Sequence, residues 1–306
     1  MNEADRRRAG SAGNSPIQGC SSEFLPSDHE TWDDELLDFE LIFSSRPSLS
    51  RRNVSIICQI LPYEVESGPA NMAIDEALLD WVCRQPDVAF FRTYGWSVPT
   101  LSLGYFQHLS QAAAEARWQA VPLVRRPTGG GAIWHHREIT YALVLPGHHP
   151  QARPSTLLYR GVHAAIASAI RACGLEVQAR LQPALGGRAT PRPFLCFLDS
   201  EPDDLVALTR KVVGSAQRRR AGAILQHGSI LLRRSEQTPE LLGIRDLADV
   251  PEDADFWAQA IERKVVESLG LRPVSCSQST LETLMRHARE LARTVYETSD
   301  WTARRP

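Results

Sequence analysis

The chain has 306 residues, of which 23% are charged and 43% hydrophobic, a composition typical of a soluble globular protein. Its formal charge of −2 provides no basic field, so the composition does not indicate a nucleic-acid-binding protein. No apolar run reaches the roughly 18 residues of a membrane span, and the N-terminus lacks an apolar signal segment. We therefore expect a cytoplasmic protein that does not insert into a membrane.

Residues 1–50 are rich in serine, proline, glycine and charge, so we expect a mostly disordered extension there. Residues 51–306 carry regular patterns and are expected to form one domain. The β-branched run Val54–Leu61 predicts a strand. Gly68 and Pro69 then open a predicted helix, and its apolar face consists of Ile74, Ala77, Leu78, Trp81 and Val82.

Two acidic residues in that helix, Asp75 and Glu76, are interpreted as capping and surface charges. After the helix, alternating apolar residues predict strands at Ala89–Tyr94 and Thr100–Leu103. A short helix is expected at Gln111–Ala120.

The segment Arg125–His136, RRPTGGGAIWHH, is the most unusual stretch of the sequence. Its glycines, Gly129 to Gly131, allow positive φ and have no Cβ atoms to keep a ligand away. Apolar residues on both sides predict strands, so two arginines flank a glycine loop between strands. Such a loop can bring peptide N–H groups to an anion or a carbonyl oxygen. A glycine triplet is also typical of a simple tight turn, and the segment is not a nucleotide-binding P-loop.

Further along, Thr140–Leu145 alternates as a strand does. Ser155 is expected to cap a long helix that Gly174 ends, and Pro183–Pro193 is expected to be a loop. Two amphipathic helices follow near the C-terminus. The first is marked by Phe256, Ala260, Val265 and Leu269, and the second by Leu281, Leu284, Ala288, Leu291 and Val295.

A second informative segment, KVVGSAQRRRAGAILQHGSILL, spans Lys211–Leu232 and predicts antiparallel strands around a hairpin at Gly222. The arginine triplet at 218–220 fits either a solvated edge strand or a patch for an acidic partner. Together these elements predict an α+β domain with a mixed, largely antiparallel sheet and packed helices. The six cysteines are scattered without a CxxC pair, so we expect neither a metal site nor a disulfide framework.

Several of these segments resemble the lipoate–protein ligase and octanoyltransferase family. They are GPANMAIDEALL (Gly68–Leu79), RRPTGGGAIWH, KVVGSAQ and LQHGSILL, in the family's order, and the C-terminal ARELARTVYETSDW resembles the family's closing helix. The resemblance covers Val54–Trp301. It implies the catalytic-domain fold shared by biotin and lipoate ligases, and it makes Lys211 the counterpart of the family's catalytic lysine. Without the resemblance, a solvated strand end would be the preferred interpretation of Lys211.

Cys196 lies in the loop sequence PRPFLCFLDSEPDD. One octanoyltransferase branch carries its nucleophile in a Cys-Phe pair upstream of the lysine, and Cys196-Phe197 resembles that pair. Another class places its cysteine three residues before the histidine of the HG pair, where this chain has Ile224. A lysine cation beside Cys196 would favour the reactive thiolate. A buried structural thiol is the alternative interpretation of Cys196.

The resemblance also implies a set of residues that bind the acyl or lipoyl group. They come from the glycine loop and from the hairpin: Arg126, Gly129, Gly130, Gly131, His135, Gly214, Ser215, Ala216 and His227. We expect both His135 and His227 to hold the glycine loop by hydrogen bonds.

The function that the resemblance favours is octanoyl transfer. Cys196 would take an octanoyl group from octanoyl-acyl carrier protein and pass it to a lysine of a lipoyl-accepting domain. The acceptors implied are the lipoyl domains of 2-oxoacid dehydrogenases or the glycine cleavage H protein, and no cofactor is required. The alternative is a lipoate–protein ligase, which would use ATP; the run Glu138–Tyr141, the ending SAQ and Cys196 favour the transferase. A biotin ligase is disfavoured because no GRGRxGR-type loop occurs, and a non-catalytic binder is disfavoured by Lys211 and the glycine loop.

Overall fold

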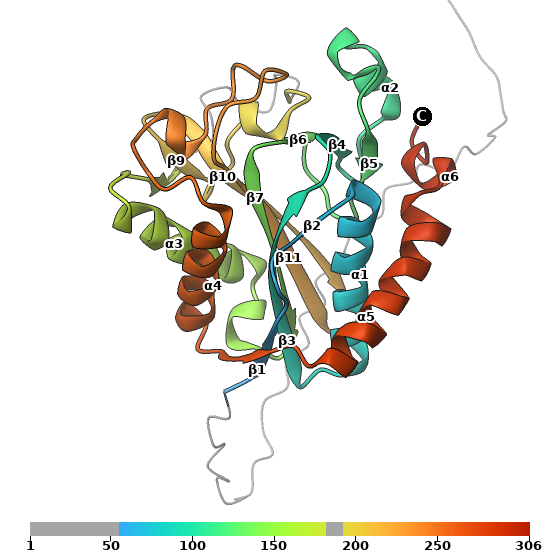
Figure 1. The fold of residues 1–306 in the computed structure, drawn as a ribbon, viewed down its shortest axis with the longest axis vertical. Helices are drawn as coiled ribbons and strands as arrows, with labels where there is room; N and C mark the ends of the chain where they lie inside the picture. Colours follow the sequence, from blue (N-terminus) through green and yellow to red (C-terminus); the bar gives the residue numbers. More distant parts are fainter. Residues whose placement is uncertain (1–54, 182–191) are drawn as a thin grey trace, which may run out of the picture. The chain divides into compact units, whose positions relative to one another are not determined.

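The computed structural model describes residues 55–181 and 192–306, so the expected extension at residues 1–50 and most of the Pro183–Pro193 loop lie outside it. A large mixed sheet runs between two layers of helices (Figure 1). Its strands, in spatial order, are β12 (Arg272–Ser275), β1 (Ile57–Ile60), β3 (Val88–Trp96), β7 (Glu138–Pro146), β11 (Ala223–Leu231), β10 (Arg210–Arg220), β9 (Leu205–Ala207) and β8 (Gln178–Ala179), and β2 (Glu64–Glu66) pairs with β3.

The sheet is antiparallel from β3 through β7, β11, β10 and β9 to β8. Parallel pairs occur only on the other side of β3, among the described strands β12, β1, β2 and β3. The predicted mixed, largely antiparallel sheet is therefore confirmed.

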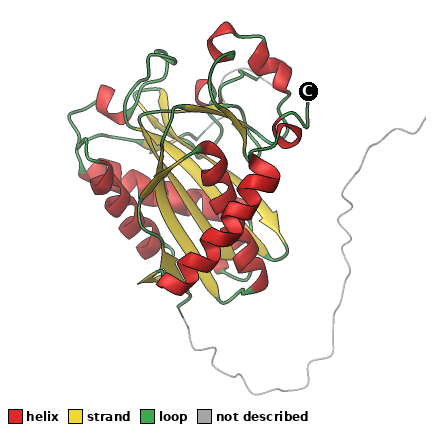
Figure 2. Cartoon of the chain, turned by 45° about the vertical axis from the view of Figure 1, so that its right-hand side comes forward, coloured by secondary structure: helices red, strands yellow, loops and turns green. Residues whose placement is uncertain are grey.

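Helices cover both faces of this sheet (Figure 2). One face carries α1 (Gly68–Arg84) and α5 (Gln278–Leu291), and the other carries α3 (Ser155–Ala172) and α4 (Ala254–Ser268). Because successive side chains of a strand point to opposite faces, Tyr141 and Leu143 of β7 pack toward α3 and α4, while Ala142 and Val144 pack toward α1. The shorter helical elements are α2 (Leu109–Ala113), η1 (Ala116–Trp118), η2 (Pro150–Ala152), η3 (Cys196–Leu198), η4 (Ile244–Asp246), η5 (Ala292–Tyr296) and α6 (Ser299–Thr302).

A second, small sheet holds the glycine loop. It contains β5 (Leu123–Arg125), β4 (Thr100–Leu103) and β6 (Ile133–His135), with β4 in the middle. The apolar cluster beneath it includes Leu101, Leu103, Trp118, Trp134, Leu195 and Phe197. The sequence predicted these strands but not their separation into a sheet of their own. The glycine loop connects β5 to β6, the two outer strands, and so passes the end of β4, where the Tyr105 N–H donates to the Thr128 carbonyl at 2.8 Å.

Local sequence signals account for most element boundaries. The Ser67 hydroxyl accepts a hydrogen bond from the Ala70 N–H at 3.4 Å and caps α1, with Pro69 in its first turn. The hairpin between β10 and β11 turns at Ala221 and Gly222, both at positive φ (44° and 82°), as a two-residue type I′ loop requires.

Two predicted boundaries were wrong. The N-cap of α3 is Pro154, and Ser155 is the first helical residue, with no side-chain cap bond at this end. The helix expected at Gln111–Ala120 begins at Leu109 and is divided into α2 and the 3-10 helix η1.

The interpretation of Asp75 as a capping or surface charge was also wrong. Its side chain is fully buried, with Arg92 Nε at 3.4 Å and the Tyr94 hydroxyl at 3.0 Å. A buried carboxylate needs such partners, because an unpaired charge inside a protein is strongly destabilising. Asp75 therefore ties α1 to β3. Glu76 is partly buried and pairs with Arg220 of β10 at 2.7 Å.

Within residues 55–181 and 192–306, no helix has both the length and the apolar character needed to cross a membrane.

Candidate active site

Arg126 shapes the glycine loop from inside. Its Nη2 donates to the carbonyl oxygens of Gly129 and Gly131, each at 2.7 Å, and its Nη1 donates to the Ser102 carbonyl at 3.2 Å. Burial lowers the pKa of Arg126 to about 10, so the guanidinium remains charged at neutral pH. Gly130, between the two bonded carbonyls, has a φ of +93°, which a side chain would strain.

Two backbone hydrogen bonds bring Cys196 to this loop. The Ala132 N–H donates to the Phe194 carbonyl and the Cys196 N–H donates to the Ala132 carbonyl, both at 2.8 Å. The loop that carries Cys196 thus extends the small sheet beyond β6 by one bridge, Ala132 to Leu195. The partly buried thiol lies beside the glycine loop although 65 positions separate Cys196 from Gly131 in the sequence.

Lys211 reaches the same thiol from the large sheet. Its Nζ lies 3.4 Å from Cys196 Sγ and 3.3 Å from the Cys196 carbonyl oxygen, and it pairs with Asp204 Oδ2 at 2.8 Å. The lysine side chain crosses directly over Gly214, where a Cβ would lie 2.5 Å from Lys211 Cε. The glycine of the GSAQ sequence is therefore required for the lysine to reach the cysteine.

The interpretation of Lys211 as a solvated strand end is excluded, because its side chain is only 3% exposed. Burial by itself lowers the pKa of Lys211, but attraction to Cys196 and Asp204 outweighs burial, and the pKa is raised above its usual value. Lys211 is consequently a buried ammonium group next to a thiol.

An apolar pocket with an empty volume of about 420 Å³, part of it open to solvent, lies beside Cys196. The predicted binding residues Arg126, Gly129, Gly130, His135, Gly214, Ser215, Ala216 and His227 all line it. Residues that the sequence did not single out complete the wall: Met72, Tyr94, Trp96, Ile133, Thr140, Gly228 and Ser229. Gly131, the remaining predicted residue, lines the outer cavity instead.

His227 holds the glycine segment as expected. Its Nε2 lies 2.6 Å from the hydroxyl of Thr128, the residue before the glycines, and its Nδ1 lies 2.8 Å from Asp75 Oδ2. Because the carboxylate can only accept, Nδ1 carries the proton and Nε2 accepts from Thr128. The buried Asp75 thus supports the glycine segment through His227.

The same expectation for His135 was wrong. His135 bonds to Glu138 Oε1 at 2.7 Å and to Ser102 Oγ at 2.8 Å, and its ring stacks on Trp96 with 3.7 Å between centroids. Burial lowers its pKa. The reason is its position on β6, next to β4, where the ring bonds to Ser102 and forms part of the pocket wall. His135 therefore helps to form the pocket wall.

A wider, more polar cavity lies outside the apolar pocket. Lys211, Asp199, Glu201, Arg192, Phe106 and Gln107 are among the residues that line it. Gly130, Cys196 and Ser215 line both cavities, so the thiol sits where the apolar pocket meets the outer cavity.

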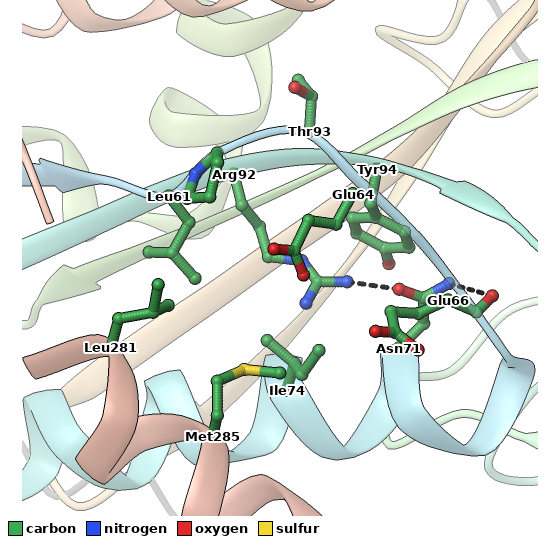
Figure 3. A pocket seen from close by; sticks show the side chains of 11 residues that line it. Leu61, Glu64, Glu66, Asn71, Ile74, Arg92, Thr93, Tyr94, Leu281 and Met285 are labelled. Carbon is green, nitrogen blue, oxygen red and sulfur yellow. Dashed lines mark hydrogen bonds between the residues drawn. The ribbon is translucent and has the colours of Figure 1, made fainter. Parts of the chain in front are cut away.

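Figure 3 shows a separate cavity between β3, α1 and α5, with an empty volume of about 300 Å³. Arg92 points into it and donates to Asn71 Oδ1 at 2.6 Å, while Leu281 and Met285 of α5 close its apolar side (Figure 3). Neither Cys196 nor Lys211 borders it. Arg92 contacts Asn71 and Asp75 of α1, and its guanidinium lies 3.8 Å from the centroid of the Tyr94 ring, so this cavity borders the contacts that join α1 to β3.

The other described cysteines lack a comparable setting. Cys58 is fully buried, and burial raises the pKa values of Cys58, Cys83, Cys173 and Cys276. A raised pKa reduces the thiolate fraction and hence the reactivity of these four thiols. Among the described residues, Cys196 is the cysteine that lies beside a lysine ammonium group.

Sequence reasoning missed three polar residues near Cys196 and Lys211. Asp204 pairs with Lys211, Tyr159 donates to Asp204 Oδ1 at 2.6 Å, and His163 lies 2.7 Å from Ser215 Oγ. Tyr159 and His163 come from α3, and the helical pattern of that segment gave no sign that they lie near the site. The sequence signal that could have identified Asp204 is its position seven residues before Lys211 of the KVVGSAQ segment.

The mixed sheet between two helical layers, with a thiol–lysine pair at the mouth of an apolar pocket, defines an α+β domain with a candidate catalytic site. The same fold occurs in a putative lipoate protein ligase from T. acidophilum with bound lipoic acid, at a TM-score of 0.62 and 23% identity over 81% of this chain and 99% of that chain. It also occurs in a lipoate-protein ligase A bound with ATP, at a TM-score of 0.61 and 23% identity over 81% and 98%.

Sequence comparison defines the family more closely. Residues 67–247 match the family described as the lipoyl protein ligase A/B catalytic domain. The chain is 34% identical to octanoyltransferase LipM of Geobacillus kaustophilus over 79% of its own length and 97% of that protein. It is 39% identical to octanoyltransferase LipM of Bacillus subtilis over 56% and 66%. The chain belongs to the lipoyl protein ligase A/B catalytic domain family.

Proposed function

We propose that the chain transfers an octanoyl group through a thioester on Cys196. The chain is an octanoyltransferase of protein lipoylation, as its similarity to several octanoyltransferases indicates. The observation that carries the proposal for Cys196 is the 3.4 Å approach of the Lys211 ammonium to its sulfur, at the junction of an apolar pocket and an outer cavity.

In the first half-reaction, the Cys196 thiolate attacks the thioester carbonyl of octanoyl-acyl carrier protein. Lys211 stabilises the thiolate and then the negative charge that develops on the carbonyl oxygen. The carrier thiolate leaves, and the octanoyl chain occupies the apolar pocket beside Trp96 and Ile133. Burial of the chain there contributes about 0.8 kcal/mol per methylene group.

In the second half-reaction, a lysine amine of a lipoyl-accepting domain enters through the outer cavity and attacks the enzyme thioester. The acceptors we propose are the lipoyl domains of 2-oxoacid dehydrogenases or the glycine cleavage H protein. The carboxylates of Asp199 and Glu201 on the cavity wall suit an incoming ammonium group. Because the route requires a free thiol, we place it in the cytoplasm, where thiols stay reduced.

The test is incubation of the purified chain with octanoyl-acyl carrier protein without ATP, followed by intact mass. We expect the chain to become heavier by one octanoyl group, and we expect hydroxylamine to remove the adduct as it cleaves thioesters. Cys196→Ala should abolish the adduct, whereas alanine at Cys83, Cys173 or Cys276 should leave it. An adduct that persists in Cys196→Ala would assign the nucleophile to another residue. Attachment of free lipoate that depends on ATP, without any adduct, would instead make the chain a ligase.

A further inference from the structure

Ser215 occupies the position where the two substrates of the second half-reaction must meet. With Gly130 and Cys196, it borders both the apolar pocket and the outer cavity. An acyl group on Cys196 that extends into the pocket leaves its carbonyl carbon at this junction. A lysine that arrives through the outer cavity then passes beside the partly buried Ser215.

His163 determines the direction of the Ser215 hydroxyl proton. His163 Nδ1 lies 2.7 Å from the carbonyl oxygen of Asp203, which can only accept, so Nδ1 carries a proton. Burial lowers the pKa of His163 to about 4, and the ring is neutral at pH 7. Its Nε2 is therefore an acceptor, and the Ser215 hydroxyl, 2.7 Å away, donates to it.

Tyr141, a second neighbour, donates a hydrogen bond to one of the two lone pairs of the Ser215 hydroxyl oxygen. Gln217 Nε2 donates to Gln226 Oε1 at 2.6 Å, which leaves Gln226 Nε2 to donate to the Tyr141 oxygen at 2.9 Å. Tyr141 then donates its own proton to Ser215 Oγ at 2.6 Å. Burial raises the pKa of Tyr141, so this proton is retained.

These bonds leave Ser215 with one lone pair and no proton for a ligand. Its backbone is fixed as well, because the Ser215 N–H donates to the Tyr159 hydroxyl at 3.1 Å. The side chain is thus a preoriented acceptor, and it can recognise only a hydrogen-bond donor. At the thioester, the reactant that carries N–H donors is the lysine amine.

We propose that Ser215 is a catalytic residue of the transfer half-reaction, and that its Oγ accepts an N–H of the attacking lysine and so directs the amine lone pair at the thioester carbon. The inference rests on the proposed thioester at Cys196. The N–C bond forms as the C–S bond breaks, and the electron pair of the C–S bond returns to the Cys196 sulfur beside Lys211. One amine proton leaves to solvent. His163, as a weak base, orients Ser215 and does not take the proton.

The test separates the two half-reactions in the full chain. Acylation is followed by intact mass after mixing with octanoyl-acyl carrier protein, and transfer is followed by adding a lipoyl domain to the acylated chain. In Ser215→Ala we expect acylation within about twofold of wild type. We expect transfer about 10- to 100-fold slower, the loss typical of one hydrogen bond to a charged or reacting group. The acyl-enzyme should consequently accumulate during turnover.

Ser235→Ala is the matched control. Ser235 is also a buried serine, and it accepts from the Trp134 indole at 2.9 Å, but it borders neither cavity. Both half-reactions should be unchanged in this variant. Ser215→Thr keeps the hydroxyl and should restore transfer, and Ser215→Gly replaces Ser215→Ala if the latter does not fold.

Transfer at the wild-type rate in Ser215→Ala would overturn the inference, as would an equal loss in both half-reactions. Failure of the wild-type chain to form an adduct is a different result, because it refutes the thioester at Cys196 itself.

Discussion

The ion pair between Asp204 and Lys211 offers a quantitative test of how the site is held together. The two side chains are 1% and 3% exposed, and Asp204 also accepts from the Tyr159 hydroxyl and the Glu201 N–H at 2.6 and 2.7 Å. Asp204→Asn preserves the shape of the side chain but removes its charge. Removal of one partner from a buried ion pair costs about 3–5 kcal/mol, because the other charge remains buried.

We therefore expect Asp204→Asn to lower the free energy of unfolding by about 3–5 kcal/mol, measured by urea denaturation at pH 7. Lys211→Met should relieve part of this cost, since no buried ammonium then lacks its partner. In a double-mutant cycle, the two substitutions together should be less destabilising than their sum by about 1–3 kcal/mol.

The pH dependence of activity provides a second measurement. Asp204 is one of the two groups that raise the pKa of Lys211, so its removal must lower that pKa. The lysine then loses its proton at a lower pH, and the alkaline limb of the transferase pH profile should shift downward in Asp204→Asn. Asp87→Asn is the control, because Asp87 is an exposed acid between α1 and β3 that borders neither cavity. Strictly additive stability changes together with an unshifted alkaline limb would refute the role of Asp204.

Three further outcomes follow from the geometry. Lys211→Ala should slow octanoyl transfer roughly 100- to 1,000-fold, measured on folded protein, and near-normal turnover would remove Lys211 from the mechanism. Gly130→Val should prevent acylation, because φ is +93° and a Cβ would lie 2.9 Å from Arg126 Nη2. If the adduct formed at the normal rate in this variant, the loop would be a simple turn without a role in acyl binding. In the folded chain the pKa of His163 is lowered from 6.5 to about 4, so between these pH values the unfolded chain binds a proton that the folded chain does not. The free energy of unfolding should therefore fall as the pH decreases from 6.5 toward 4, by about 3 kcal/mol at most. Denaturant unfolding at pH 7 and pH 5 should show this loss in the wild type and a smaller one in His163→Gln, whereas equal losses would contradict the assignment.

Much of the fold was predictable because the signals are local. The central strands β3, β7 and β11 are largely apolar, Gly68 and Pro69 mark the start of α1, and Gly222 marks the hairpin. Spaced motifs also determined the family, and with it Cys196 and Lys211. The strands, the helix start and the hairpin depend mainly on the backbone preferences of residues that are close in sequence.

The errors concern residues whose environment comes from distant segments. Asp75 looks like an ordinary helix-surface acid, yet α1 packs with this side toward Arg92, Tyr94 and His227. His135 looks like a support for the adjacent glycine loop, yet β6 turns its ring onto Trp96. Burial and hydrogen-bond partners depend on how elements pack, and no local pattern encodes that.

The sequence by itself determined most of the elements, the family, and the proposal of Cys196 and Lys211 for thioester formation. Only the tertiary structure decided how they act together. Cys196 comes from a loop on the small sheet, Lys211 from the large sheet, and His163 from a helix behind it. The direction of the hydrogen bond at Ser215 follows from the burial of His163 and Tyr141, and this burial exists only once the layer of α3 and α4 has packed on the sheet.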